Sequence, residues 1–476
     1  MTDTGDRPHV PASSSARPGA TGSPQQWVGL GVVLIGTLIV ALDSTIVAIA
    51  LPQIGRALDA GQSVQWVVTA NLLAVAVSMP AAGWIANRLG AKRVFLTSLA
   101  LFSLASLAAA LAPSLGALIV ARALQGLCAG IINPISMTIV LDLFAPVERG
   151  RAIGVWGLVA MTAPAVGPTL GGYLVTSVSW HWLFLPNVPL GIAGAIAGRR
   201  LLADSPPRPR TSLDVVGLLL GASGLALFLF TLAQSRRWGW AEPITVSFLA
   251  VSVVLLGAFT RHALRTANPL LDLRLARNPV FGASLLVIAL ATVPQYARAV
   301  FVPLQFQQLR GYSALKVGAM LTPSAVMTAL SMAIGGRLVD RMGARGPAIA
   351  GCTLMLIGTA GNAFITVTTS VAWITASLAV QGFGVGLVMI PITVVGLNAL
   401  PDVALPQAST LRSLTNQAGA ATVVAFLFTI VNARLASARS IAASQHAYNV
   451  TFQIAMVALV LAIGVASRMP GRPQGV

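Results

Sequence analysis

One acidic residue, Asp43, lies deep inside a long apolar segment, whereas the other acidic residues fall in tails, in loops or at segment ends. A carboxylate inside a membrane costs several kcal/mol unless it is paired or protonated. Desolvation favours the neutral acid and a nearby cation favours the carboxylate, so such a group can take up and release a proton reversibly. We therefore interpret Asp43 as a proton carrier. The alternative is a fixed hydrogen bond that ties its helix to a neighbour.

Two arginines in apolar segments, Arg122 and Arg298, could act on this carboxylate. Arginine is permanently charged, so neither releases a proton itself, but either could change the protonation of Asp43 by approaching and withdrawing. The internal repeat described below places residue 296 opposite Asp43. This favours an outer gate formed by Asp43 and Arg298. Alternatively, Arg298 reaches toward the outer surface or recognises an anionic group of a substrate.

Other kinds of chemistry find little support in the sequence. The two cysteines, Cys128 and Cys352, lie in apolar runs, so neither a disulfide framework nor a metal cluster is predicted. The four histidines lie in the tail, at segment ends or in loops, and no glycine-rich phosphate loop with Lys-Ser/Thr occurs. We expect no metal, no cofactor and no enzymatic activity, and any transport should be secondary.

The composition defines the environment of these residues. Charged residues make up 9% of the 476 residues, hydrophobic residues make up 56%, and the mean hydropathy is +0.83. Soluble domains average about 25% charged residues, so an ordinary soluble enzyme is excluded. The net charge of +18 would suggest nucleic-acid binding in a soluble chain, but here the basic residues gather in loops on one side of the predicted membrane spans.

Apolar stretches of about 20 residues, the length that crosses a bilayer, predict fourteen helices in groups of six, two and six. The predicted spans are 27–51, 64–85, 94–112, 116–141, 152–176, 182–199, 213–233, 243–262, 279–304, 316–338, 347–367, 372–399, 410–431 and 450–467. With both termini inside, the basic segments 88–93, 199–210, 261–277 and 337–345 all face the cytoplasm, as the positive-inside rule requires.

A ten-residue pattern occurs at the end of the second span in each group of six. Residues 83–93 read GWIANRLGAKR and residues 336–345 read GRLVDRMGAR, in the same frame. Glycines let two helices approach closely, and basic residues hold the inner surface. Basic anchoring alone would explain one copy, but two copies in register favour a pair of inner gates. The predicted gate residues are Gly83, Asn87, Arg88, Gly90, Lys92, Arg93, Gly336, Asp340, Arg341, Gly343 and Arg345.

A second correspondence supports duplicated halves. Gln125-Gly126 with Gly130 matches Gln381-Gly382 with Gly386, each in the fourth span of its group. Two similar halves around a central site predict alternating access.

These motifs resemble the major facilitator superfamily, and within it the fourteen-helix drug:proton antiporter family. Residues 42–47 (LDSTIV) and 50–52 (ALP) are similar to that family's first-helix motif. Arg122, Gln125, Gly126 and Gly130 are similar to its fourth-helix motif, whose arginine is implicated in proton transfer. Gln125 and Arg298 are candidates for a gate or a substrate contact.

The fifth predicted span carries the residues that resemble the antiporter motif: Gly154, Gly167, Pro168, Gly171 and Gly172. Their spacing alone indicates only close helix packing with a bend at the proline. Two departures from the family pattern stand out, Asn87 where aspartate is usual and Ala163 where glycine is common. Asparagine can hydrogen-bond a helix end but carries no charge, so the latch at the first loop should be weaker, and Asp340 in the second copy compensates in part.

The sequence therefore predicts an all-α polytopic membrane protein with the major facilitator fold, in which two central helices are added to two six-helix halves. The predicted parts are a disordered tail (1–26), an N-terminal half (27–200), two inserted helices with basic linkers (201–278), a C-terminal half (279–467) and a second tail (468–476).

We expect a monomeric, proton-coupled exporter of hydrophobic small molecules, such as drugs or natural products, in a bacterial inner membrane. Its partners would be substrate, protons and membrane lipids, without nucleic acid. The alternatives are a facilitator for uptake, a lipid-moving transporter or a membrane sensor that transports nothing.

Overall fold

The computed structural model describes residues 23–205, 212–240 and 242–471, and within these residues the secondary structure is entirely helical. The predicted disordered N-terminal tail, part of the basic linker before residue 212 and the last five residues of the C-terminal tail lie outside the described residues. Several helices begin after a serine, a short polar residue that favours the capping position. For example, Ser23 and Gln26 form a capping box, and Ser114, Ser313, Ser370 and Ser440 each accept a hydrogen bond from the first turn that follows.

The first group of helices forms the N-terminal half. It comprises α1 (Pro24–Ala57), η1 (Gly61–Gln65), α2 (Trp66–Ser78), η2 (Met79–Ala81), α3 (Ala82–Leu89), α4 (Ala91–Ala110), α5 (Leu115–Leu143), α6 (Arg149–Ser177), η3 (Trp180–Leu183) and α7 (Asn187–Leu201).

Two helices and a short connecting helix separate this half from the next. They are α8 (Val215–Trp238), α9 (Pro243–Arg265) and η4 (Leu273–Arg277). The C-terminal half comprises α10 (Pro279–Tyr296), the π-helix η5 (Ala297–Phe301), α11 (Val302–Arg310), α12 (Ala314–Met342), α13 (Arg345–Ala363), α14 (Val371–Asn398), η6 (Asp402–Ala404), α15 (Leu405–Ser437) and α16 (Ile441–Ala466).

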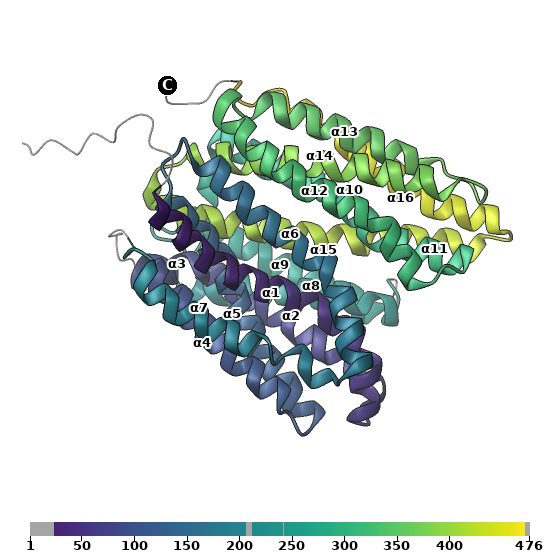
Figure 1. Ribbon diagram of the computed structural model, residues 1–476, viewed down its shortest axis with the longest axis horizontal. Coiled ribbons are helices and arrows are strands. Elements are labelled where there is room, and N and C mark those ends of the chain that lie inside the picture. The colour runs from purple at the N-terminus through teal and green to yellow at the C-terminus, as the bar shows by residue number, and fades with distance from the viewer. Residues whose placement is uncertain (1–22, 206–211, 241, 472–476) are drawn as a thin grey trace, which may run out of the picture.

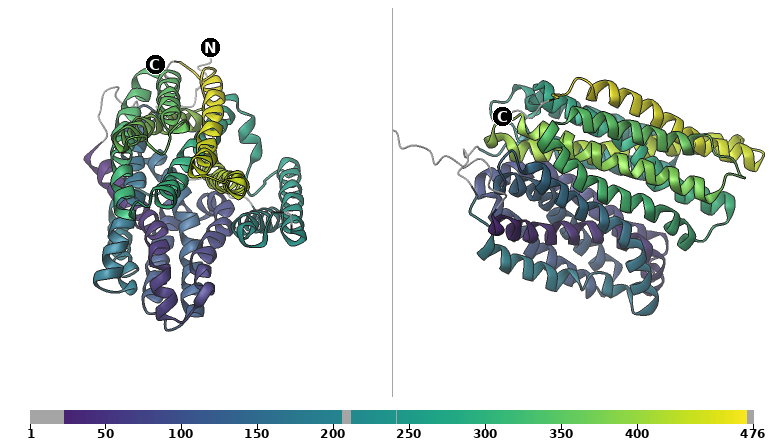
Figure 2. Two further views of the ribbon diagram at one scale, coloured as in Figure 1. Left: turned by 90° about the vertical axis from the view of Figure 1, so that its right-hand side faces the viewer. Right: turned by 45° about the horizontal axis from the view of Figure 1, so that its top comes forward.

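The two halves lie side by side and diverge toward one end of the molecule (Figure 1). They meet where α6 packs against α12 and α14, and where α15 packs against α3 and α5. The pair α8–α9 stands beside this bundle, with α8 against α2 of one half and α15 of the other (Figure 2).

Every predicted span overlaps one of these helices or a run of consecutive helices. Among the described residues, eleven helical segments are long and apolar enough to cross a membrane. The helices α6, α7 and α13 are not among them, so the count of fourteen spans and the cytoplasmic termini stay predictions. Several helices begin earlier than predicted, because their first turns are polar. For example, α15 starts at Leu405 rather than at residue 410, and α16 starts at Ile441 rather than at residue 450.

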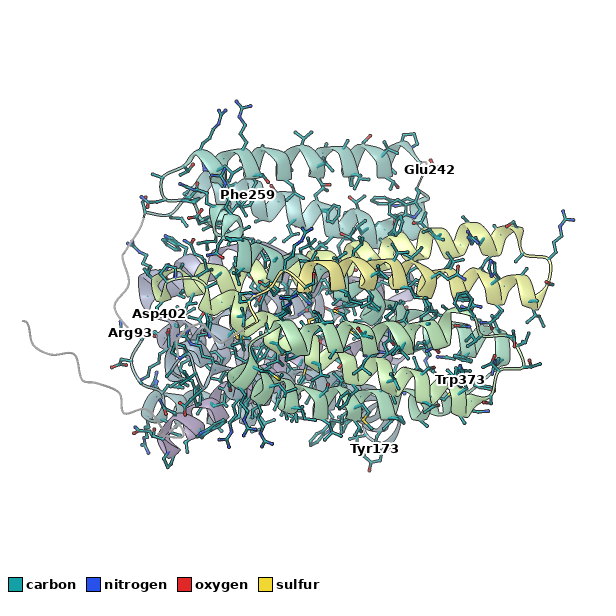
Figure 3. The ribbon with its side chains drawn as sticks, turned by 90° about the horizontal axis from the view of Figure 1, so that it is seen from above. Arg93, Tyr173, Glu242, Phe259, Trp373 and Asp402 are labelled. Carbon is teal, nitrogen blue, oxygen red and sulfur yellow. The ribbon has the colours of Figure 1, made fainter. Side chains whose placement is uncertain are left out.

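Both copies of the repeated loop turn at a glycine. Gly90 and Gly343 have φ values of +87° and +76°, a region that other residues rarely adopt, and each ends a helix. We call the end of the molecule that carries these two loops the basic end. Arg93 and Asp402 lie at this end, whereas Glu242 and Trp373 lie toward the other (Figure 3).

The hydrophobic core shows how the halves are joined. The largest cluster of buried apolar residues includes both halves near the basic end, for example Leu141 and Ile153 with Val339 and Leu405. Toward the opposite end the core divides into one cluster within the N-terminal half and another within the C-terminal half. The structure is therefore closed at the basic end and separated at the other.

Candidate functional site

The centre of the N-terminal half holds an ion pair between Asp43 of α1 and Arg122 of α5. The Nη1 atom of Arg122 lies 2.5 Å from Oδ2 of Asp43, and the two residues are 1% and 3% exposed, respectively. The pair answers the question that the sequence left open, because it is Arg122 and not Arg298 that contacts the carboxylate in this conformation.

Two amides complete the shell around this carboxylate. The Nε2 atom of Gln125 donates to Oδ1 of Asp43 at 3.3 Å, and Nδ2 of Asn187 donates to the same oxygen at 3.4 Å. Gln125 also accepts a hydrogen bond from Nη1 of Arg122 at 2.9 Å and donates to Oγ of Ser106 at 2.7 Å. Gln125, a candidate gate or substrate contact, is therefore part of the ion-pair network and is fully buried.

The arginine is also held by the backbone of α2. Its Nε atom donates to the carbonyl oxygen of Val67 at 3.2 Å, and its own carbonyl oxygen accepts a hydrogen bond from Nδ2 of Asn71. The ring of Phe184 lies 5.8 Å from the guanidinium carbon. Because α1, α2, α4, α5 and α7 all contribute, the site belongs to one half and does not bridge the two.

This geometry ties α1 and α5 together through two buried, opposite charges. The carboxylate of Asp43 accepts three hydrogen bonds, one of them from the guanidinium group of Arg122, and a hydrogen bond between two charged groups is stronger than one between neutral groups. Breaking a buried pair leaves an uncompensated charge, which costs about 3–5 kcal/mol. The pair therefore fixes the position of Arg122 relative to α1.

Arg298 lies in η5, a single π-helical turn that interrupts the predicted span 279–304, the first of the C-terminal half. Its Nη1 atom donates to Oγ of Ser324 on α12. The proposed outer gate between Asp43 and Arg298 is not formed, because Asp43 is occupied within its own half and the halves are separated at this level.

Asp340, in the second of the two predicted inner gates, joins the two halves. Its Oδ1 and Oδ2 atoms accept hydrogen bonds from the backbone N–H groups of Gly150 and Arg151, each at 3.1 Å. These N–H groups belong to the first turn of α6, where the helix dipole favours a negative charge. Gly336, one turn earlier, allows the backbone of α12 to contact the carbonyl oxygen of Gly150 directly.

The equivalent gate at Asn87 has no such cap. Gly83 packs on the start of α15, because a Cβ atom at this glycine would lie 3.0 Å from the carbonyl oxygen of Pro406 and from the Cα atom of Gln407. Oδ1 of Asn87, however, is buried without a hydrogen-bond partner. We predicted a weakened hydrogen bond to a helix end here, and that hydrogen bond is missing. Pro406 occupies the place of Gly150 and has no N–H to offer.

The remaining loop residues lie at the surface of the basic end. Lys92 pairs with Asp204 at 3.1 Å, and its N–H donates to Oγ of Ser205. The side chains of four further predicted gate residues are exposed: Arg88, Arg93, Arg341 and Arg345.

Sequence reasoning missed a second link between the halves. Arg149, the first residue of α6, donates to Oδ1 of Asn398 at 2.8 Å and to Oδ1 of Asp402 at 3.1 Å. It also donates to the carbonyl oxygens of Leu141 and Phe144, so it is 5% exposed. Its place three residues before the predicted span 152–176 was the only signal in the sequence.

The glycines of α6 face two different neighbours. A Cβ atom at Gly154 would lie 2.9 Å from the carbonyl oxygen of Met332 in the other half. Gly167 and Gly171 instead contact α1 at Thr45 and Ile46. Close packing at these three positions agrees with the prediction. The surroundings of Pro168 and Gly172, in contrast, lie outside what the structure describes.

Metal ligands do not gather in the described residues, where no group of three or more His, Cys, Asp or Glu side chains could hold an ion. The arrangement of two helical halves with a closed basic end is that of a membrane transporter.

The chain belongs to the Major Facilitator Superfamily, whose family model matches residues 33–424. It is 33% identical to the puromycin resistance protein pur8 of Streptomyces alboniger, an alignment that covers 95% of this chain and 92% of the relative. It is 32% identical to the tetracenomycin C resistance and export protein of Streptomyces glaucescens, over 91% of this chain and 80% of that protein. Together with the membrane-spanning helices, these bacterial relatives identify a multi-pass protein of a bacterial inner membrane.

Solved structures show the same fold. The human organic anion transporter MFSD10 superposes with a TM-score of 0.63 at 18% identity, over 92% of this chain and all of that chain. The proton:xylose symporter XylE superposes with a TM-score of 0.62 at 14% identity, over 93% of this chain and 97% of that one.

Proposed function

We propose that this transporter exports hydrophobic small molecules in exchange for protons. The observation that carries the proposal is the buried pair of Asp43 and Arg122, with Gln125 and Asn187 on the same carboxylate. The relatives whose names include resistance or export support the outward direction. The basic end faces the cytoplasm in this proposal, since that orientation satisfies the positive-inside rule.

The closed basic end then corresponds to a conformation open to the outside. Protons enter from the outside, where their concentration is higher, and protonate Asp43. Neutral Asp43 releases Arg122, and this change within the N-terminal half favours the opposite conformation, in which the basic end opens. A proton leaves to the cytoplasm as substrate binds, and the ion pair forms again.

The experiment is reconstitution into proteoliposomes with an imposed pH gradient. Movement of cationic, uncharged and anionic lipophilic dyes is followed for the wild type, for Asp43→Asn and for the matched control Glu242→Gln. Glu242 is exposed at the start of α9, a helix that contributes no residue to the ion-pair network. We expect gradient-driven movement to be lost in Asp43→Asn and kept in Glu242→Gln.

A second readout separates coupling from folding. Because asparagine resembles the protonated acid, Asp43→Asn should still exchange dye across the membrane without a gradient. Gradient-driven accumulation by Asp43→Asn at the wild-type rate would contradict the proposal, and so would a wild type that accumulates no dye of any charge.

A further inference from the structure

Two arginines of the C-terminal half have no acidic partner within the described part of the chain. Arg298 donates only to Ser324, a neutral hydroxyl, and no ion pair joins it to a carboxylate. Arg412, on α15, also forms no ion pair, and its Nε atom is buried without a hydrogen-bond partner. Arginine stays charged, and a cation in the interior of a membrane protein is costly unless an anion or water accompanies it.

Arg412 is directed at the boundary between the halves. Its guanidinium carbon lies 6.0 Å from the ring centre of Trp156 on α6, and Trp156 donates to Oγ1 of Thr37 on α1 at 2.9 Å. The opposite face of α15, with Leu414 and Ala418, packs against the cluster around α8. Arg412 therefore points away from α8 and toward the surface that opens when the halves separate.

The two arginines lie on neighbouring helices that run in the same direction. Thr292 of α10 lies beside Gly419 of α15. Further along, the ring centres of Phe301 in η5 and Phe428 in α15 are 4.8 Å apart. With a rise of 1.5 Å per residue, Arg412 lies roughly 20 Å closer to the basic end than Arg298. The C-terminal half thus carries two uncompensated positive charges at different depths, whereas the charge of Arg122 in the other half is neutralised by Asp43.

We propose that the transported substrate is a lipophilic organic acid, whose carboxylate is held first by Arg412 and then by Arg298. This assignment rests on the proposed function, and it names the class of substrate. Guanidinium groups bind carboxylates with paired, charge-assisted hydrogen bonds. The indole of Trp156 beside Arg412 offers an apolar surface for the body of the molecule.

The test measures binding of two probes that differ only in charge, naphthaleneacetate and naphthaleneacetamide, to the purified full-length protein. We expect the wild type to bind the acid more tightly than the amide. Because the two arginines lie too far apart to hold one carboxylate together, Arg298→Gln and Arg412→Gln should each remove the acid site at the replaced arginine and keep the other. The double variant should weaken binding of the acid by about ten- to a hundredfold, because it removes hydrogen bonds between charged groups at both sites, and should leave amide binding unchanged. Arg412→Lys, which keeps the charge, should retain part of the preference.

Arg434→Gln is the matched control, because Arg434 lies on the same helix and is exposed. It should leave both affinities unchanged. If either arginine served only to pack the helices together, its replacement would weaken binding of acid and amide alike. That result would overturn the proposal, as would a wild type with equal affinity for the two probes or with none for either.

Failure of this proposal can be told from failure of proton-coupled export. Gradient-driven movement of cationic dye without any preference for the acid would remove the substrate assignment and leave antiport intact. Preferential binding of the acid without gradient-driven movement of any dye would remove antiport and leave the substrate assignment intact.

Discussion

The two predicted inner gates should differ strongly in strength, and exchanging their key residues tests this. Asp340 accepts two hydrogen bonds from the first turn of α6, each at 3.1 Å. In Asp340→Asn one oxygen acceptor and the negative charge are lost. A hydrogen bond to a charged group contributes about 1.5–3 kcal/mol, against about 1 kcal/mol for a neutral one. The closed basic end should therefore lose about 2 kcal/mol, which lowers its population relative to the open form by about thirtyfold.

The reverse change at the other gate should have a smaller effect. Asn87→Asp adds a charge near the start of α15, but Pro406 provides no N–H there and only the N–H of Gln407 remains. The gain is limited to the interaction with the helix dipole and one hydrogen bond, about 1 kcal/mol, or about fivefold in favour of the closed form.

The assay is a distance measurement between spin labels at the basic end. Arg93 and Arg345 are exposed, belong to different halves and can be replaced by cysteine for labelling. The native Cys128 and Cys352 are buried and would be replaced by alanine. We expect Asp340→Asn to increase the long-distance population and Asn87→Asp to decrease it slightly. An unchanged distribution in Asp340→Asn would refute the capping argument, and a larger effect of Asn87→Asp would refute the argument from Pro406.

Two further predictions concern packing and pH. Gly171→Leu should destabilise the protein by about 1–3 kcal/mol and reduce transport, because a side chain there meets Ile46 at 3.0 Å. Gly31→Leu, at a position with open space around it, is the control, and equal thermal unfolding of the two variants would contradict the packing argument. At the start of α8, burial raises the pKa of Asp214, but hydrogen bonds from the N–H of Gly217 and from His262 outweigh it and lower this pKa. A carboxyl group with a lowered pKa in the folded state stabilises the fold above its unfolded pKa of about 4 and loses this contribution as the pH falls through the folded value. Asp214→Asn should therefore lower the free energy of unfolding by about 1–2 kcal/mol at neutral pH, seen as a lower unfolding temperature, but have little effect at about pH 3. A difference between the variant and the wild type that does not change with pH would contradict the assignment.

Much of the helical architecture could be predicted from the sequence, because long apolar segments in a membrane have few alternatives to helices. The ends of the helices were less predictable. Hydropathy marks the part of a helix in the membrane core, but α15 and α16 continue into polar turns. Arg412 already lies inside the predicted span 410–431, but hydropathy does not show which way it faces, and the structure directs it at the other half.

The chemistry of the site was partly predictable. Asp43 and Arg122 were identified because charges are rare in apolar segments, and the structure brings them into contact. Among their neutral partners Gln125 was singled out, but Ser106 and Asn71 were not, since they are common residue types and their roles depend on which faces of α4 and α2 turn inward. The pairing of Asp43 with Arg298 depended on how close the halves come, which the sequence does not specify.

The position of α8 has a consequence for how a molecule dissolved in the lipid could enter. The halves meet along two seams, one where α6 packs against α12 and one where α15 packs against α5. The helix α8 covers the second seam, because it packs against both α2 and α15. The side chains that line this contact are alkyl and aromatic, among them Leu225, Leu229 and Leu414. Such contacts are not directional, so the halves can slide against α8 without breaking hydrogen bonds. The added pair of helices would then act as a sliding cover that keeps lipid tails out of this seam, and a solute arriving from the bilayer would have to enter on the side of α6 and α12.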